Sequence, residues 1–305
     1  MINTANLKKR LVFVAFAVPL ALIFINSTFS FSAPLSKLLG HTPGPDLAPI
    51  YPGQVIAFLL AMLGAYEYRK MLSIIFPVNA FWIGYVWITT MGLAYLFNYA
   101  VPGTLSIYVL LILVAFEAFF CGKTNPQARW KRACLFFSGI VFLNIASISM
   151  MSLFRDPFMQ LFAPSTIPFM HFIAIVVVIT AVFMCDSAAY FVGSAWGKRR
   201  LSASISPNKT IEGSVAGLAA SILIVSISWI FIRDPKYPVF IGPIMGVLIG
   251  VTAQAGDLLV SLIKRYFKVK DAGSMIHGHG GVLDRFDSLF FAAPVLYLLA
   301  WVLTR

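Results

Sequence analysis

Charged residues gather near the C-terminus, between Asp257 and Asp287, in a chain that otherwise has few. Asp257, Ser261, Lys264 and Lys268 are spaced by four, three and four residues, so a continuous helix would present them on one face. Asp257 stands seven residues before the first lysine, roughly two turns deeper along that helix and inside an apolar run. A carboxylate at that depth needs a metal ion or a cationic partner.

A glycine-rich loop follows, between Lys270 and Gly281, with four glycines in its last nine residues. Flexible backbone of this kind can direct several amide N–H groups at phosphate oxygens, helped by Lys and Arg. Asp284 and Asp287 then lie three residues apart, on one face at the start of a last helix. Together with Asp257 they are hard oxygen ligands, suited to a Mg²⁺ ion that holds nucleotide phosphates.

His277 and His279 lie within this loop. Zinc is not expected there, because no Cys or third His stands nearby. His279, between two glycines, is better suited to bind a phosphate or to orient a ligand. The chain has no Ser-His-Asp arrangement and no Walker-type loop, so its polar residues favour phosphoryl or nucleotidyl transfer, in which positioning and charge neutralisation dominate.

A second polar segment lies upstream. Asp186 directly follows an apolar run, Pro207 breaks the chain, Asn208 and Thr210 suit a turn or a helix cap, and Glu212 falls in the first turn of the next apolar helix. An ordinary basic loop is the alternative interpretation. Against it, the two acidic residues flank four cations close to membrane depth, where ionisable groups are costly and usually functional.

Composition indicates which elements must position these residues. Hydrophobic residues make up 60% of the 305-residue chain and charged residues 11%, against about 25% charged residues in soluble domains. The chain is therefore predicted to be an integral membrane protein. Its net charge of +12 fits cytosolic loops of such a protein and does not require nucleic acid. Three cysteines with no ligand-like spacing favour neither a disulfide framework nor a metal site.

Apolar runs long enough to cross a bilayer predict an all-α polytopic fold with nine spans. The predicted spans are Leu11–Phe29, Ile50–Tyr66, Leu72–Phe97, Thr104–Phe120, Ala133–Phe154, Ile167–Cys185, Gly213–Ile232, Val239–Ile263 and Ser288–Leu303. The first run resembles a signal peptide, but the rest of the chain is equally apolar, so an uncleaved span is favoured. The predicted division is an N-terminal scaffold over 1–165 and a catalytic region over 166–305.

Loop charge predicts the orientation. With the N-terminus in the cytosol, eighteen of the 23 Lys and Arg fall on the cytosolic side and five on the other. The charged cluster then faces the cytosol. Glu67 and Glu117 lie near cytosolic ends of the second and fourth spans; each could be a buried site carboxylate, but an interfacial residue paired with a nearby Lys or Arg is the favoured interpretation.

Small residues four apart predict close helix packing in two of the spans. They are Gly242, Gly246 and Gly250 in the eighth span and Gly213 and Gly217 in the seventh. Packing explains these glycines without a functional role.

Several stretches of the second half carry a family resemblance. They read Ser261-Leu-Ile-Lys264-Arg265, Lys270-Asp271, Gly278-His279-Gly280-Gly281 and Asp284-Arg285-Phe-Asp287, with Asp186-Ser-Ala-Ala-Tyr-Phe-Val-Gly193, Trp196-Gly-Lys198 and Ile205-Ser-Pro-Asn-Lys209-Thr-Ile-Glu212-Gly213 upstream. This pattern resembles the phosphatidate cytidylyltransferases, or CDP-diacylglycerol synthases. It spans about Asp186–Ser288, and the N-terminal half agrees only in hydropathy. His277 stands where that family has a proline, so a stiff turn is missing.

The resemblance implies that CTP and phosphatidate give CDP-diacylglycerol and pyrophosphate with Mg²⁺, or with Mg²⁺ and a second cation, on the cytosolic side of a bacterial inner membrane. The partners would be these substrates and membrane lipid, without nucleic acid, and a homodimer is compatible with the sequence. Catalytic candidates are Asp257, Asp284, Lys264, Arg265 and Asp287. Substrate-binding candidates are Lys198, Lys209, Ser261, Lys270, His279, Gly280, Gly281 and Arg285. The metal candidates are Asp257 and Asp284, with Asp287 and Asp186 as second choices.

Two alternatives remain at this point. A CTP-dependent transferase or kinase could act on another membrane lipid, such as a polyprenol or an ether-lipid phosphate. An ion-coupled transporter also uses intramembrane Asp and broken helices, but here the charges crowd at one membrane face and no inverted repeat is visible.

Overall fold

Helices dominate the computed structural model of the chain, which describes residues 52–75, 81–96, 126–154, 158–161, 168–202, 205–275 and 280–305. The helices are α3 (Pro52–Ile75), α4 (Phe81–Leu96), α6 (Pro126–Ser152), the short 3₁₀ helix η1 (Phe158–Leu161), α7 (Pro168–Trp196), α8 (Ile211–Ile232), α9 (Ile241–Tyr266) and α10 (Leu283–Leu303). The strands β1 (Arg200–Ser202) and β2 (Ser206–Thr210) form an antiparallel hairpin between α7 and α8.

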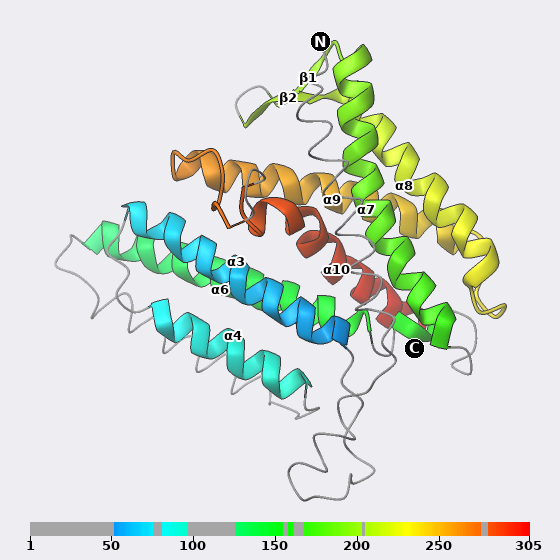
Figure 1. Cartoon of the computed structure of the whole chain (residues 1–305), viewed down its shortest axis with the longest axis horizontal. Helices are drawn as coiled ribbons and strands as arrows, with labels where there is room; N and C mark the ends of the chain where they lie inside the picture. Colours follow the sequence, from blue (N-terminus) through cyan, green and yellow to red (C-terminus); the bar gives the residue numbers. More distant parts are fainter. Residues whose placement is uncertain are drawn as a thin grey trace, which may run out of the picture.

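The helices form two groups joined by α10 (Figure 1). In one group α7 packs along α8, and α8 packs against α9. In the other, α6 contacts both α3 and α4, which also contact each other. Helix α10 contacts α9 on one side and α6 on the other, so it brings the N-terminal and C-terminal halves of the chain together.

Five of the described helices are long and apolar enough to cross a membrane. These segments are Ala133–Ser152, Ile173–Trp196, Ile211–Ile232, Ile241–Tyr266 and Leu283–Leu303. They confirm a polytopic helical membrane protein and agree with the last five predicted spans. The first and fourth predicted spans lie outside the described residues.

Two predicted span boundaries were wrong. Helix α3 continues through Glu67 to Ile75, where a loop was predicted between the second and third spans. No Gly or Pro interrupts the chain between Ala65 and Phe76, so nothing local ends the helix there. Helix α7 runs to Trp196 instead of ending at Cys185, which places Asp186 inside a helix. A charged residue after an apolar run therefore did not mark the end of either helix.

The segment between α7 and α8 is more ordered than the predicted loop. Arg200 pairs with Thr210, and Ser202 pairs with Ser206 across the hairpin. Thr210 is the N-cap of α8, as predicted, because its side-chain oxygen accepts the N–H of Gly213 at 3.2 Å. Glu212 lies in the first turn of α8, also as predicted.

The glycine rows pack helices against one another, as the spacing predicted. A Cβ atom on Gly217 would lie 2.6 Å from the Cys185 carbonyl oxygen of α7. A Cβ on Gly246 would lie 2.6 Å from the Ile222 Cα of α8. Such separations leave no room for a side chain, so backbone meets backbone at both crossings.

Candidate active site

Two Lys–Asp ion pairs define the centre of the site. Lys209 Nζ, at the end of β2, lies 2.5 Å from Asp257 Oδ2 on α9. Lys264 Nζ, near the end of α9, lies 2.6 Å from Asp284 Oδ1 in the first turn of α10. The sequence predicts a metal ion or a cationic partner for Asp257, and Lys209 is such a partner. The second pair is the more buried, with side chains 13% and 8% exposed against 26% and 32% in the first.

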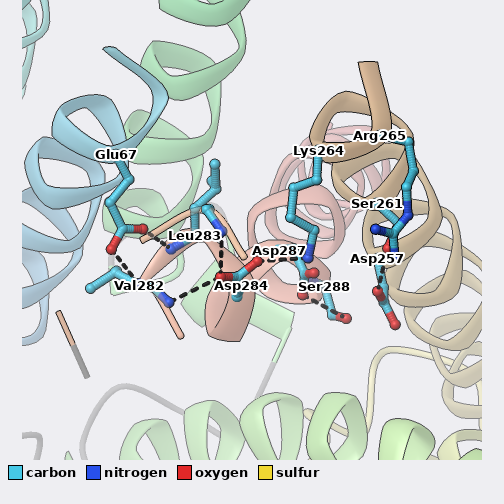
Figure 2. A network of polar contacts seen from close by, with 12 residues as sticks. Glu67, Asp257, Ser261, Lys264, Arg265, Val282, Leu283, Asp284, Asp287 and Ser288 are labelled. Atoms are coloured by element: carbon cyan, nitrogen blue, oxygen red, sulfur yellow. Dashed lines mark hydrogen bonds and ion pairs between the residues drawn. The ribbon is translucent and has the colours of Figure 1, made fainter. Parts of the chain in front are cut away.

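Asp284 also holds the glycine-rich loop. Its Oδ2 atom accepts the backbone N–H of Ala272 at 2.8 Å and that of Gly281 at 2.9 Å. One carboxylate therefore binds a lysine of α9 and both ends of the loop (Figure 2). Gly280 has φ +84°, the left-handed conformation that glycine adopts without a steric penalty. The loop's turn into α10 thus depends on that glycine.

The predicted face of α9 is only partly present. Ser261 donates a hydrogen bond to Asp257 Oδ1 at 3.4 Å, so these two residues share a face. Lys268 does not, because α9 ends at Tyr266 and Lys268 has a left-handed φ of 57° beyond it. The N–H of Val269 returns to the carbonyl of Lys264 at 3.0 Å, which closes the helix end.

A second acidic group lies deeper, where α10 faces α7. Asp287 is 5% exposed and accepts the backbone N–H of Ser288 at 2.7 Å. The Ser288 hydroxyl lies 3.1 Å from Asp186 Oδ2 and 3.4 Å from Asp287 Oδ1. A single hydroxyl donates one proton, so Ser288 serves one carboxylate at a time. The structure thus brings Asp186 of the upstream segment to the last helix.

The basic upstream segment is held by backbone contacts. Glu212 accepts the backbone N–H groups of Lys198 at 3.1 Å and Arg199 at 3.2 Å, which leaves the lysine side chain exposed toward the surface. Arg265 Nε donates to the Ile205 carbonyl of the hairpin at 3.4 Å. This contact places α9 beside the hairpin at the site.

The remaining candidates fall around this centre. Lys270 is exposed in the loop after α9, and Arg285 lies in the first turn of α10. His277 and His279 lie outside the described residues.

The carboxylates fit a magnesium ion in chemistry but do not form a ready-made cage. Within the described part of the chain, no three His, Cys, Asp or Glu side chains are arranged to hold a metal ion. Asp257 and Asp284 instead belong to separate ion pairs. Mg²⁺ typically keeps several waters and binds one or two carboxylates together with substrate phosphates. Two separated aspartates are compatible with that mode.

Glu67 is buried against the start of α10, next to Asp284, so the favoured interpretation of it as an interfacial ion-pair residue was wrong. It is 1% exposed, and its carboxylate accepts the backbone N–H of Val282 at 2.9 Å and of Leu283 at 2.7 Å (Figure 2). The available signal was its position: a rare acidic residue in the apolar first half of the chain. The neighbouring Arg69 and Lys70 offered a simpler explanation. Glu117 lies outside the described residues.

Fold and site together define a polytopic membrane protein in which two Lys–Asp pairs lie beside a glycine-rich loop. A family model described as the cytidylyltransferase family matches residues 48–303. The chain belongs to this family. The match includes α3, α4 and α6, so it reaches into the half that resembled the family only in hydropathy.

Three similar proteins share one name. The chain is 42% identical over 118 residues to the phosphatidate cytidylyltransferase of Bacillus subtilis (strain 168), covering 39% of this chain and 44% of that protein. It is 35% identical over 214 residues to that of Staphylococcus haemolyticus (strain JCSC1435), covering 66% and 79%. It is 44% identical over 118 residues to that of Staphylococcus aureus (strain COL), covering 39% and 45%. The first and third matches span less than half of the relatives' length.

Proposed function

We propose that this chain transfers CMP from CTP to phosphatidate, giving CDP-diacylglycerol and pyrophosphate. The observation that carries the proposal is the pair of Lys–Asp contacts at 2.5 and 2.6 Å beside a glycine-rich loop, in a membrane-embedded member of the cytidylyltransferase family. The relatives' shared name supports phosphatidate as the acceptor.

The proposed reaction does not require a strong general base. A phosphate monoester has a second pKa of about 6, so phosphatidate is mostly dianionic near neutral pH. Its phosphate oxygen attacks the α-phosphorus of CTP, a new P–O bond forms, and the bond to the β-phosphate oxygen breaks with its electrons leaving on pyrophosphate. Lys209 and Lys264 would bind phosphates of the two substrates, and Arg265 and Arg285 would supply further positive charge near them.

Asp257 and Asp284 would hold Mg²⁺, with Asp287 and Asp186 as further carboxylates for it or for a second cation. Bound there, the ion would neutralise charge on the triphosphate. The lysines now paired with the two aspartates would then be available to the substrate phosphates. Lys198, Ser261, Lys270, His279, Gly280 and Gly281 complete the proposed substrate-binding set.

The site would open toward the cytosol of a bacterial inner membrane. CTP is a water-soluble cytosolic nucleotide, and the orientation predicted from the sequence puts eighteen of the 23 Lys and Arg on the cytosolic side. Phosphatidate would reach the same site from the bilayer. The Ser288–Asp186 contact joins α10 to α7 at this site.

Turnover of labelled CTP tests the proposal. Purified protein in detergent micelles would be given phosphatidate or a polyprenol, with CTP labelled at the α- or the γ-phosphate. The expected result is α-label in lipid product with phosphatidate alone. Transfer of γ-label to lipid, or reaction with polyprenol in place of phosphatidate, would contradict it.

A further inference from the structure

Glu67 of α3 caps the N-terminus of α10, and it lies 215 residues before the N-cap residue Val282 in the sequence. Helix α10 begins at Leu283, and its own N-cap residue, Val282, makes no side-chain cap hydrogen bond. Valine has no acceptor with which to make one. The Glu67 carboxylate of α3 accepts both the Val282 and the Leu283 N–H groups instead. Two of the backbone donors that a helix leaves without intrahelical partners are thereby satisfied.

Two glycines of the loop lie so close to this carboxylate that neither has room for a side chain. A Cβ atom on Gly273 would lie 2.5 Å from Glu67 Oε1, and one on Gly281 would lie 2.4 Å from Glu67 Oε2. Neither glycine has a positive φ; among the described glycines only Gly280 does. Backbone conformation alone would therefore accept alanine at Gly273 and Gly281, and the approach of Glu67 is the reason for glycine.

The buried charge of Glu67 is balanced by backbone. Within the described residues, no ion pair joins this carboxylate to a Lys or Arg. A buried carboxylate is costly unless donors surround it, and the N-terminus of α10 supplies N–H groups and the positive end of a helix dipole. Glu67 and that helix end therefore stabilise each other.

The same turn carries the site's aspartate. The Gly281 N–H goes to Asp284, and the next two N–H groups along the chain go to Glu67 (Figure 2). Asp284 in turn binds Lys264 and the Ala272 N–H. A substitution of Glu67 is therefore expected to alter the conformation of the turn that orients Asp284.

We propose that Glu67 is a positioning residue: from the N-terminal half of the chain, it fixes the glycine-rich loop and the first turn of α10 so that Asp284 is held in place for catalysis. Its effect on turnover rests on the proposed function. Under this proposal α3, which lies in the region 1–165 predicted to be a scaffold, also supplies a residue that positions the site.

Hydrogen exchange tests the structural half without any substrate. Glu67→Gln keeps the side chain's size but replaces one acceptor oxygen with an NH2 group, which donates hydrogen bonds and cannot accept them. Deuterium uptake should rise in peptides covering residues 272–283, by about tenfold in rate, since a buried donor loses its partner. The control is Gln54→Leu, also a buried polar residue of α3, whose amide bonds the Met151 carbonyl of α6. It should leave uptake over 272–283 unchanged.

Kinetics and a second variant complete the test. Glu67→Gln should lower kcat by about tenfold with the KM for phosphatidate unchanged, whereas Gln54→Leu should keep kcat. Gly273→Ala should lower kcat in the wild-type background and have a smaller effect beside Glu67→Ala, because the clash is then absent. Unchanged exchange in Glu67→Gln, or strictly additive effects of the two alanine variants, would overturn the proposal. Wild-type protein that does not turn over CTP with phosphatidate would refute the proposed function, while the exchange result would still decide the role of Glu67.

Discussion

Lys209 Nζ lies 2.5 Å from Asp257 Oδ2, and this contact ties the hairpin after α7 to the middle of α9. The lysine comes from the basic segment upstream of the seventh predicted span, and the aspartate comes from the eighth. The two polar regions of the sequence are therefore one site. Because both side chains are about one-quarter to one-third exposed, the pair is accessible to a charged substrate.

Asp257→Asn should lower the rate of CMP transfer by about a hundredfold or more, the loss typical of a removed electrostatic contact in an active site. Steady-state turnover of CTP with phosphatidate measures it. Asp234→Asn is the matched control, because Asp234 pairs with Lys236 at 3.6 Å outside the site. Equal activity in the two variants would refute the assignment of Asp257.

Asp284→Asn and Lys264→Met should have non-additive effects on stability and on turnover. Each change leaves a largely buried partner, and breaking a buried pair typically costs about 3–5 kcal/mol. The double variant should therefore be less destabilised than the sum of the single variants, as measured by thermal unfolding in detergent. Additive losses would show that the 2.6 Å contact contributes nothing.

Removal of divalent cations should abolish turnover while leaving the fold intact. Lys209 and Lys264 supply positive charge next to Asp257 and Asp284, so no folding role for the ion is expected. Chelator should stop CTP turnover, Mg²⁺ should restore it, and the circular dichroism melt should be the same before and after. Full activity in the presence of chelator would contradict the magnesium proposal.

Gly246→Ala should destabilise the protein, whereas Gly64→Ala should not. A Cβ at Gly246 meets the Ile222 Cα at 2.6 Å, while at Gly64 the nearest atom, in Leu143, is at an ordinary 3.4 Å. Overpacking against backbone typically costs about 1–3 kcal/mol. Thermal unfolding midpoints in detergent compare the two variants. A midpoint for Gly246→Ala equal to wild type would mean that α8 and α9 separate easily.

The sequence by itself determined a helical membrane protein and the residue types of its site. Apolar runs reported the last five spans, because helix length across a bilayer is fixed by hydrocarbon thickness. The spacing of Asp257 and Ser261 gave their shared face because helical geometry is local. The shared face predicted for Lys268 was wrong, because α9 ends at Tyr266 and no glycine or proline in the sequence indicates that end.

Only the tertiary structure decided which charged residues contact each other. Lys209 lies beside Asp257 and Lys264 beside Asp284 because α8, α9 and α10 pack closely at glycine-lined crossings, and no local sequence pattern predicts those contacts. Glu67 is the clearest case. It bonds Val282, 215 residues away, and the sequence offered Arg69 and Lys70 as nearer partners. Whether a buried carboxylate is balanced by a cation or by the N-terminus of a helix depends on what packing brings to it, and packing is not written in sequence spacing.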